Sequence, residues 1–148
     1  MTTFVTPVLW LSIDLSFSSS YSVGLVIYDK AQSEEIWCGF KYLSKERSRN
    51  TGMTNNQAEY MGLVYVLERA LGLGIRRVVA QGDSDLVVKQ MQGRYKVRDT
   101  KLIPLYERAV KLAKSFDSFK IEHIPRKLNA RADYLANHAM DYRSDSFD

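Results

Sequence analysis

The chain of 148 residues contains one cysteine, Cys38, and three prolines. A single cysteine forms no disulfide within the chain and cannot supply the four thiolates of an all-cysteine zinc site or iron–sulfur cluster. This cysteine usage favours a reducing, intracellular compartment. The chain also lacks a run of about 18 apolar residues, the length that a membrane-spanning helix needs, and its start lacks the basic segment of a signal peptide. We therefore expect no membrane segment and no secretory leader.

Neither sign of charge dominates, since 21 basic and 17 acidic residues give a net charge of +4. Such an excess permits a polyanionic partner without requiring one. Hydrophobic residues make up 45% of the chain and charged residues 26%, which is typical of a globular protein. We expect a single domain over residues 1–148, with a core at about 8–141 and a short tail at 142–148. The sequence indicates no protein partner, and we expect a monomer.

The spacing of apolar residues predicts an α/β fold. Strands are expected at 8–15, 21–28, 34–43, 76–81 and 118–124. Helices are expected at 56–73 with Thr54 as N-cap, at 85–92, around the apolar stripe from Leu102 to Phe116, and at 130–141. The link at 29–33 has hairpin length, so the first strands form an antiparallel meander before strands and helices alternate. This order predicts a mixed five-stranded sheet with helices on both faces.

Four acidic residues lie outside the solvated helix faces and loops where most of the others fall. They are Asp14 in an apolar strand, Glu59 in the first turns of a helix, Asp83 at a strand-to-helix turn and Asp133 in the first turn of the last helix. Taken singly, each suits a structural role, such as an acid at the positive end of a helix dipole. Taken together, a strand, a strand end and two helix starts can meet at one place on the sheet. Clustered carboxylates repel one another unless a cation lies between them, and Mg²⁺ prefers oxygen ligands. Because two such ions promote phosphodiester hydrolysis, the set predicts a metal-dependent nuclease.

Four segments of the chain resemble the type 1 ribonuclease H family. They are SID at 12–14, TNNQAEY at 54–60, GDSDLVVKQMQGRYKVRD at 82–99 and IEHIPRKLNARADYLAN at 121–137. The resemblance covers roughly residues 8–141 and implies the mixed sheet of the ribonuclease H fold. It is strongest to the short branch found in archaea, plants and retroelement polyproteins. That branch lacks an extra basic helix that holds substrate, and here only about ten residues join the second and third expected helices.

The resemblance implies an endonuclease that hydrolyses the RNA strand of an RNA–DNA hybrid and leaves a 5′-phosphate. It implies that Asp14, Glu59, Asp83 and Asp133 hold two Mg²⁺ ions, for which Mn²⁺ substitutes. It also implies substrate contacts at Thr54, Asn55, Asn56, Gln57 and Asn129. Amide side chains at a helix start suit the 2′-hydroxyls by which RNA is told from DNA. The basic loop that holds Arg94 and Lys96 suits backbone phosphates, although an ordinary solvated turn has the same composition.

The chain departs from the family pattern at two places. The family usually has a glycine directly after the first aspartate, whereas here Leu15, Ser16 and Phe17 follow Asp14. Many members carry a histidine on a glycine-rich loop before the last aspartate, whereas residues 125–128 contain neither residue type. We expect His123 to be structural and His138 to lie on the surface. These departures leave two alternatives open.

The first alternative is a module of the same fold that binds hybrids or other nucleic acids with weak or lost cleavage. The second is a related metal-dependent nuclease that acts on DNA. The sequence does not fix whether the chain stands alone or belongs to a larger polyprotein.

Overall fold

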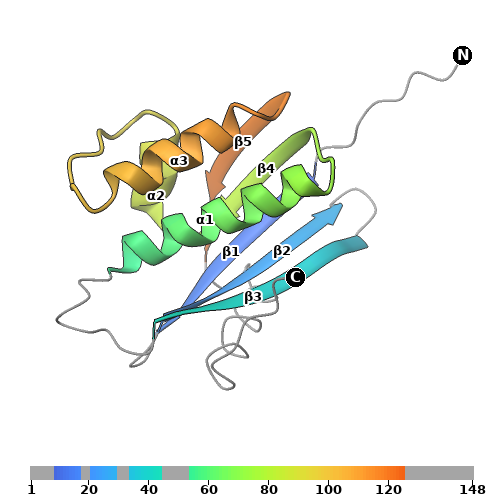
Figure 1. Ribbon diagram of the computed structural model, residues 1–148, viewed down its shortest axis with the longest axis horizontal. Helices are drawn as coiled ribbons and strands as arrows, with labels where there is room; N and C mark the ends of the chain where they lie inside the picture. Colours follow the sequence, from blue (N-terminus) through green and yellow to red (C-terminus); the bar gives the residue numbers. More distant parts are fainter. Residues whose placement is uncertain (1–8, 18–20, 30–33, 45–53, 126–148) are drawn as a thin grey trace, which may run out of the picture.

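The computed structural model describes residues 9–17, 21–29, 34–44 and 54–125. In the first three strands it describes the backbone and, at Ile27, the side chain. The strands are β1 (Leu9–Phe17), β2 (Tyr21–Asp29), β3 (Glu34–Ser44), β4 (Arg77–Gly82) and β5 (Ser118–His123). The helices are α1 (Asn55–Gly72), α2 (Asp85–Met91) and α3 (Ile103–Ala113) (Figure 1). The helix expected over 130–141 lies outside the described residues.

The five strands form one mixed sheet in the order β3-β2-β1-β4-β5. β1 pairs antiparallel with β2, and β2 with β3, which confirms the predicted meander. β4 then runs parallel to both β1 and β5. Ile13 in β1 is the register partner of Gly82 in β4. Because parallel strands progress in the same direction, the next residues, Asp14 and Asp83, follow at the same end of the sheet.

β1 extends further than the strand predicted at 8–15, because it continues beyond Leu15 to Phe17, which pairs with Tyr21. Leu15, Ser16 and Phe17 thus extend a strand at the place where the family has a glycine-containing turn. Directly across from Asp14 on β2 lies Gly24. Cross-strand partners stand closest on a sheet, and Gly24 brings no side chain to this neighbour position. The position opposite Asp14 on the neighbouring strand is therefore free of a side chain.

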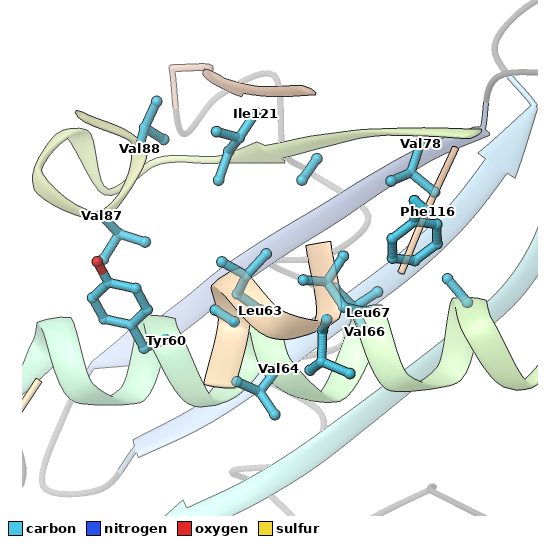
Figure 2. Packing of buried hydrophobic residues seen from close by; sticks show 14 of the residues in the cluster. Tyr60, Leu63, Val64, Val66, Leu67, Val78, Val87, Val88, Phe116 and Ile121 are labelled. Carbon is cyan, nitrogen blue, oxygen red and sulfur yellow. The ribbon is translucent and has the colours of Figure 1, made fainter. Parts of the chain in front are cut away.

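Helix α1 provides the centre of the hydrophobic core. It contacts β1 and β2 as well as α2 and α3, and its buried side chains fill the space between them (Figures 1 and 2). Leu63 and Leu67 are fully buried, whereas Met61 and Leu71 are half-buried. A helix that packs against a sheet on one side and against another helix on a second side buries a wider arc than one stripe. The buried surface of α1 is therefore wider than a single apolar stripe.

The observed helix α3 is shorter than the apolar stripe from Leu102 to Phe116 predicted. α3 ends at Ala113, yet Phe116 is only 7% exposed and packs in the core from the turn that follows (Figure 2). Ala109 and Leu112 are buried on α3 itself. Among the described residues, no helix has the length and apolar character needed to cross a membrane.

Candidate active site

Glu59 is the most unusual side chain of the described residues. It lies in the second turn of α1, is 2% exposed, and has its carboxylate at the end of β4. A β-carbon at Gly82 would come within 2.6 Å of Glu59 Oε1, so the carboxylate occupies the space that a side chain at position 82 would fill. The backbone N–H of Ser84 donates a hydrogen bond to this carboxylate. The second oxygen, Oε2, is buried and has no hydrogen-bond partner among the described residues.

The surroundings of Glu59 disfavour its charged form. Burial raises the pKa of this carboxyl well above its usual range, and the negative charge of Asp83 raises it further. The N–H of Ser84 acts in the opposite direction and lowers the pKa, but it is the smallest of the three effects. A buried carboxylate that has one unpartnered oxygen and lies beside a second carboxylate is costly as a free anion. It is stable either in its protonated, neutral form or as the ligand of a cation. The geometry therefore suits a bound cation.

Asp83 follows β4 directly and is half-buried. Its carbonyl oxygen lies 3.2 Å from His123 Nε2, which donates a hydrogen bond when that nitrogen carries the proton. This contact between the ends of β4 and β5 agrees with the structural role expected for His123, although the residue is exposed. This contact uses the side chain of His123 and the backbone carbonyl of Asp83, so it does not occupy the Asp83 carboxylate.

The other two residues of the predicted quartet are described less fully. The backbone of Asp14 follows Ile13, the register partner of Gly82, and so reaches the end of the sheet where Asp83 lies. Asp133 lies outside the described residues, as does Asn129. Among the side chains that the structure describes, no group of three histidine, cysteine, aspartate or glutamate residues could hold a metal ion. The described part of the quartet is therefore the pair Glu59 and Asp83, together with the backbone position of Asp14.

The segment 54–57 forms the start of α1. Thr54 is the N-cap, as the sequence predicted, because its hydroxyl accepts from the backbone N–H of Gln57 at 3.2 Å. The side chain of Gln57 returns the contact and accepts from the N–H of Thr54 at 2.9 Å, which completes a capping box. Both side chains hold the helix end that precedes Glu59. Any contact of these two side chains with nucleic acid, as predicted, would therefore use atoms that the capping box does not engage.

Ser84 joins the starts of α1 and α2. Its hydroxyl caps α2 by accepting from the N–H of Val87 at 3.4 Å, and it lies 3.4 Å from Asn56 Oδ1 on α1. Its own N–H contacts Glu59. One residue therefore contacts an acid of the quartet and an asparagine of the predicted substrate motif. Local sequence pattern indicates only the capping role of Ser84, because its contacts to α1 depend on residues more than 20 positions earlier in the chain.

The basic loop lies between α2 and α3, and no further helix occurs in this described stretch. Arg94 and Lys96 are exposed, as phosphate contacts would require. A pocket of about 550 Å³ separates the loop from α3, with Tyr106 and Glu107 on its far wall. Tyr95 is 49% exposed and lies under the ammonium of Lys89, 5.0 Å from the ring centre, so it belongs to this surface and not to the core.

Known proteins share both the sequence pattern and the fold of this chain. The family model described as Reverse transcriptase-like matches residues 18–139. The crystal structure of RNase H1 from the halophilic archaeon Halobacterium salinarum is 33% identical, with a TM-score of 0.80, and the match covers 90% of this chain and 98% of that one. The chain belongs to the type 1 ribonuclease H family. This membership confirms the predicted fold class, the ribonuclease H fold with its mixed sheet.

Two further relatives of this ribonuclease H domain are informative. LC11-RNase H1, solved in complex with an RNA/DNA hybrid, is 29% identical with a TM-score of 0.80, over 91% of this chain and 98% of that one. The curated Ribonuclease HI of Halobacterium salinarum is 46% identical over 88 residues, which are 60% of this chain. The curated relatives are matched over only 26% to 44% of their own length.

Proposed function

We propose that this ribonuclease H domain hydrolyses the RNA strand of RNA–DNA hybrids and is a divalent-metal-dependent endonuclease. One observation carries the proposal. The buried Glu59 carboxylate has one oxygen without a hydrogen-bond partner among the described residues, and it lies beside Asp83 at the sheet end that the backbone of Asp14 also reaches. Such an arrangement is unfavourable without a cation, so a purely structural role explains it poorly. The RNA/DNA complex of LC11-RNase H1, a neighbour of the same fold, supports the substrate class.

The donor set fits a hard divalent cation. Glu59 and Asp83 offer carboxylate oxygens, and the part of the chain that the structure describes gives the buried Oε2 of Glu59 no hydrogen-bond partner, a role that a metal ion or its water would fill. With Asp14 and Asp133, these residues would hold two Mg²⁺ ions, which Mn²⁺ would replace. When bound, such ions activate a water molecule and stabilise the leaving oxygen of the scissile phosphodiester. The raised pKa of Glu59 means that cation binding and loss of its proton are coupled.

The protein surface around these acids suits a hybrid duplex. Asn55 and Asn56 stand at the start of α1, where free backbone N–H groups and the helix dipole favour anions. Asparagine amides there can hydrogen-bond the 2′-hydroxyls and minor-groove edges that mark the RNA strand. Beyond the C-terminal end of α2, the exposed Arg94 and Lys96 would contact backbone phosphates of the hybrid. We propose Thr54, Gln57 and Asn129 as further substrate contacts, in line with the family motif.

The proposal is tested by cleavage of four labelled duplexes of one sequence: RNA–DNA hybrid, duplex RNA, duplex DNA and branched DNA. We expect cleavage of the RNA strand in the hybrid alone, with 5′-phosphate ends, in Mg²⁺ but not in EDTA. Asp83→Asn should retain hybrid binding and lose cleavage. Cleavage of DNA instead would favour a related DNA nuclease, and tight hybrid binding without any cleavage would favour a binding module. Either result, or full activity of Asp83→Asn, contradicts the proposal.

We further propose that the domain works as a monomer inside the cell. The single cysteine, Cys38, fits a reducing compartment. Size-exclusion chromatography with light scattering tests the first part of this proposal, with one chain mass of 17.0 kDa as the expected result. Fractionation of the source cells tests the second part.

A further inference from the structure

The residue after Glu59 makes a second buried contact with α2. Tyr60 is 0% exposed, and its hydroxyl donates to Gln90 Oε1 at 2.6 Å. Gln90 is 4% exposed, so both polar groups are removed from water and depend on one another. The ring of Tyr60 rises from α1 towards Val87 of α2, as Figure 2 shows. Its other side packs edge-on against Tyr106 of α3, with ring centres 6.4 Å apart.

Neighbouring residues of α1 therefore hold the two ends of α2. Glu59 contacts Ser84 at the first end, and Tyr60 contacts Gln90 in the last turn. Successive side chains leave a helix about 100° apart, which lets two adjacent residues reach separate points of a crossing helix. The two contact points on α2 lie six residues apart, which is about 9 Å along a helix. Two attachments at this spacing fix both the position and the direction of α2.

The direction of α2 matters because its first residues carry the Asp83 turn. Ser84 is the N-cap of α2 and follows Asp83 directly, so a tilt of α2 that shifts Ser84 also shifts Asp83 relative to Glu59. We propose that the Tyr60–Gln90 hydrogen bond positions Asp83 against Glu59 and thereby sets the affinity of the acidic site for divalent cations. Tyr60 and Gln90 are positioning residues in this proposal, and the inference rests on the metal site argued under the proposed function.

The test measures Mg²⁺ binding by the rise in melting temperature with Mg²⁺ concentration, which needs no substrate and no turnover. Tyr60→Phe removes the hydroxyl and keeps the ring, and we expect the apparent Kd for Mg²⁺ to rise by about 10-fold or more, the usual effect of losing a supporting contact around a metal site. Val66→Ala is the matched control, because it truncates another fully buried side chain of α1 away from this contact. It should lower the melting temperature yet leave the Kd within about two-fold, since it does not touch the metal site.

The double variant Tyr60→Phe/Gln90→Leu separates positioning from stability. It removes both polar partners, so it should be more stable than Tyr60→Phe alone while its Mg²⁺ affinity stays low. If the single variant does not fold, the Mg²⁺ affinity of the double variant alone tests the positioning role. Wild-type affinity in either variant overturns the positioning role and leaves the metal site intact. A wild-type protein that does not respond to Mg²⁺ overturns the metal site itself, and with it this inference.

Discussion

Gly82 and Glu59 share one volume at the end of β4, because a β-carbon on residue 82 would lie 2.6 Å from Glu59 Oε1. We predict that Gly82→Ala displaces the Glu59 carboxylate and weakens Mg²⁺ binding by about 10–100-fold, the range found for changes around metal sites. Isothermal titration with Mg²⁺ measures the change directly.

Gly72→Ala is the control for Gly82→Ala. Position 72 is the last residue of α1 and has no atom within 4 Å of an added β-carbon. It should stabilise the protein by about 0.5–1 kcal/mol, because alanine is the better helix former, and should leave Mg²⁺ affinity unchanged. If both variants bind Mg²⁺ as the wild type does, the close approach of Gly82 has no part in the site.

Glu59→Gln keeps the shape of the side chain and removes its charge. We expect the metal-free protein to gain about 1–3 kcal/mol in free energy of unfolding, because a poorly partnered buried charge is replaced by a neutral group. Hybrid cleavage should fall by more than about 100-fold, since even supporting residues around a metal cost 10–100-fold. Urea denaturation and a cleavage assay give the two values. A variant that loses both stability and activity would indicate that Glu59 is a structural acid.

The stability of the metal-free protein should depend on pH through Glu59. The pKa of this carboxyl is higher in the folded protein than in the unfolded chain, where it is about 4.3. Between these two pKa values the folded state binds more protons than the unfolded chain. The stability contributed by protonated Glu59 is therefore complete below the unfolded pKa and is lost as pH rises through the folded pKa. Saturating Mg²⁺ should reverse the trend, because the cation binds the ionised form.

Denaturation curves across this pH window, with and without Mg²⁺, test the pH prediction. Other carboxylates titrate in the same range, so the informative quantity is the difference between the wild type and Glu59→Gln at each pH. That difference should grow as pH rises through the folded pKa of Glu59 and should shrink when Mg²⁺ is added. A difference that stays constant with pH would show that Glu59 keeps an ordinary pKa.

Arg94 and Lys96 should contribute to affinity through phosphates alone. Replacement of either by alanine in an Asp83→Asn background, where the hybrid is not cleaved, should weaken binding for every sequence alike. The slope of log K against log salt should fall in magnitude by about 1 for each residue. Fluorescence anisotropy at several salt concentrations measures the slope. Arg76→Ala is the control, because this exposed arginine pairs with Asp117 at the opposite end of β4 and should not change the slope.

The sequence predicted those parts of the site that depend on local pattern. Thr54 as N-cap of α1 followed from its place before an apolar helical stretch, and the structure confirms it. Glu59 and Asp83 were identified by residue type in an unusual position, and their carboxylates do interact. Each of these inferences needed only a few neighbouring residues.

The contacts that arrange the site could not be predicted in this way. Tyr60 and Gln90 are 30 residues apart in the chain and meet only because α1 crosses α2. A tyrosine at an apolar position of a helix predicts burial but does not identify the partner of its hydroxyl. Gly82 directly follows the strand expected at 76–81, whereas in the structure it is the last residue of β4 and provides the space for Glu59.

The parallel pairing of β1 with β4 has a consequence for how the site forms during synthesis. Leu9 pairs with Val78, so the chain must close a loop of about 70 residues before this pairing forms, which is slow compared with hairpin closure. β1, β2 and β3 can pair as soon as they emerge from the ribosome, but one edge of β1 then stays unpaired until β4 has been synthesised. An unpaired edge of this kind invites association with other chains. The repulsion between the acids also arises only when β4 docks, so cellular Mg²⁺ would promote the last step of folding as well as catalysis.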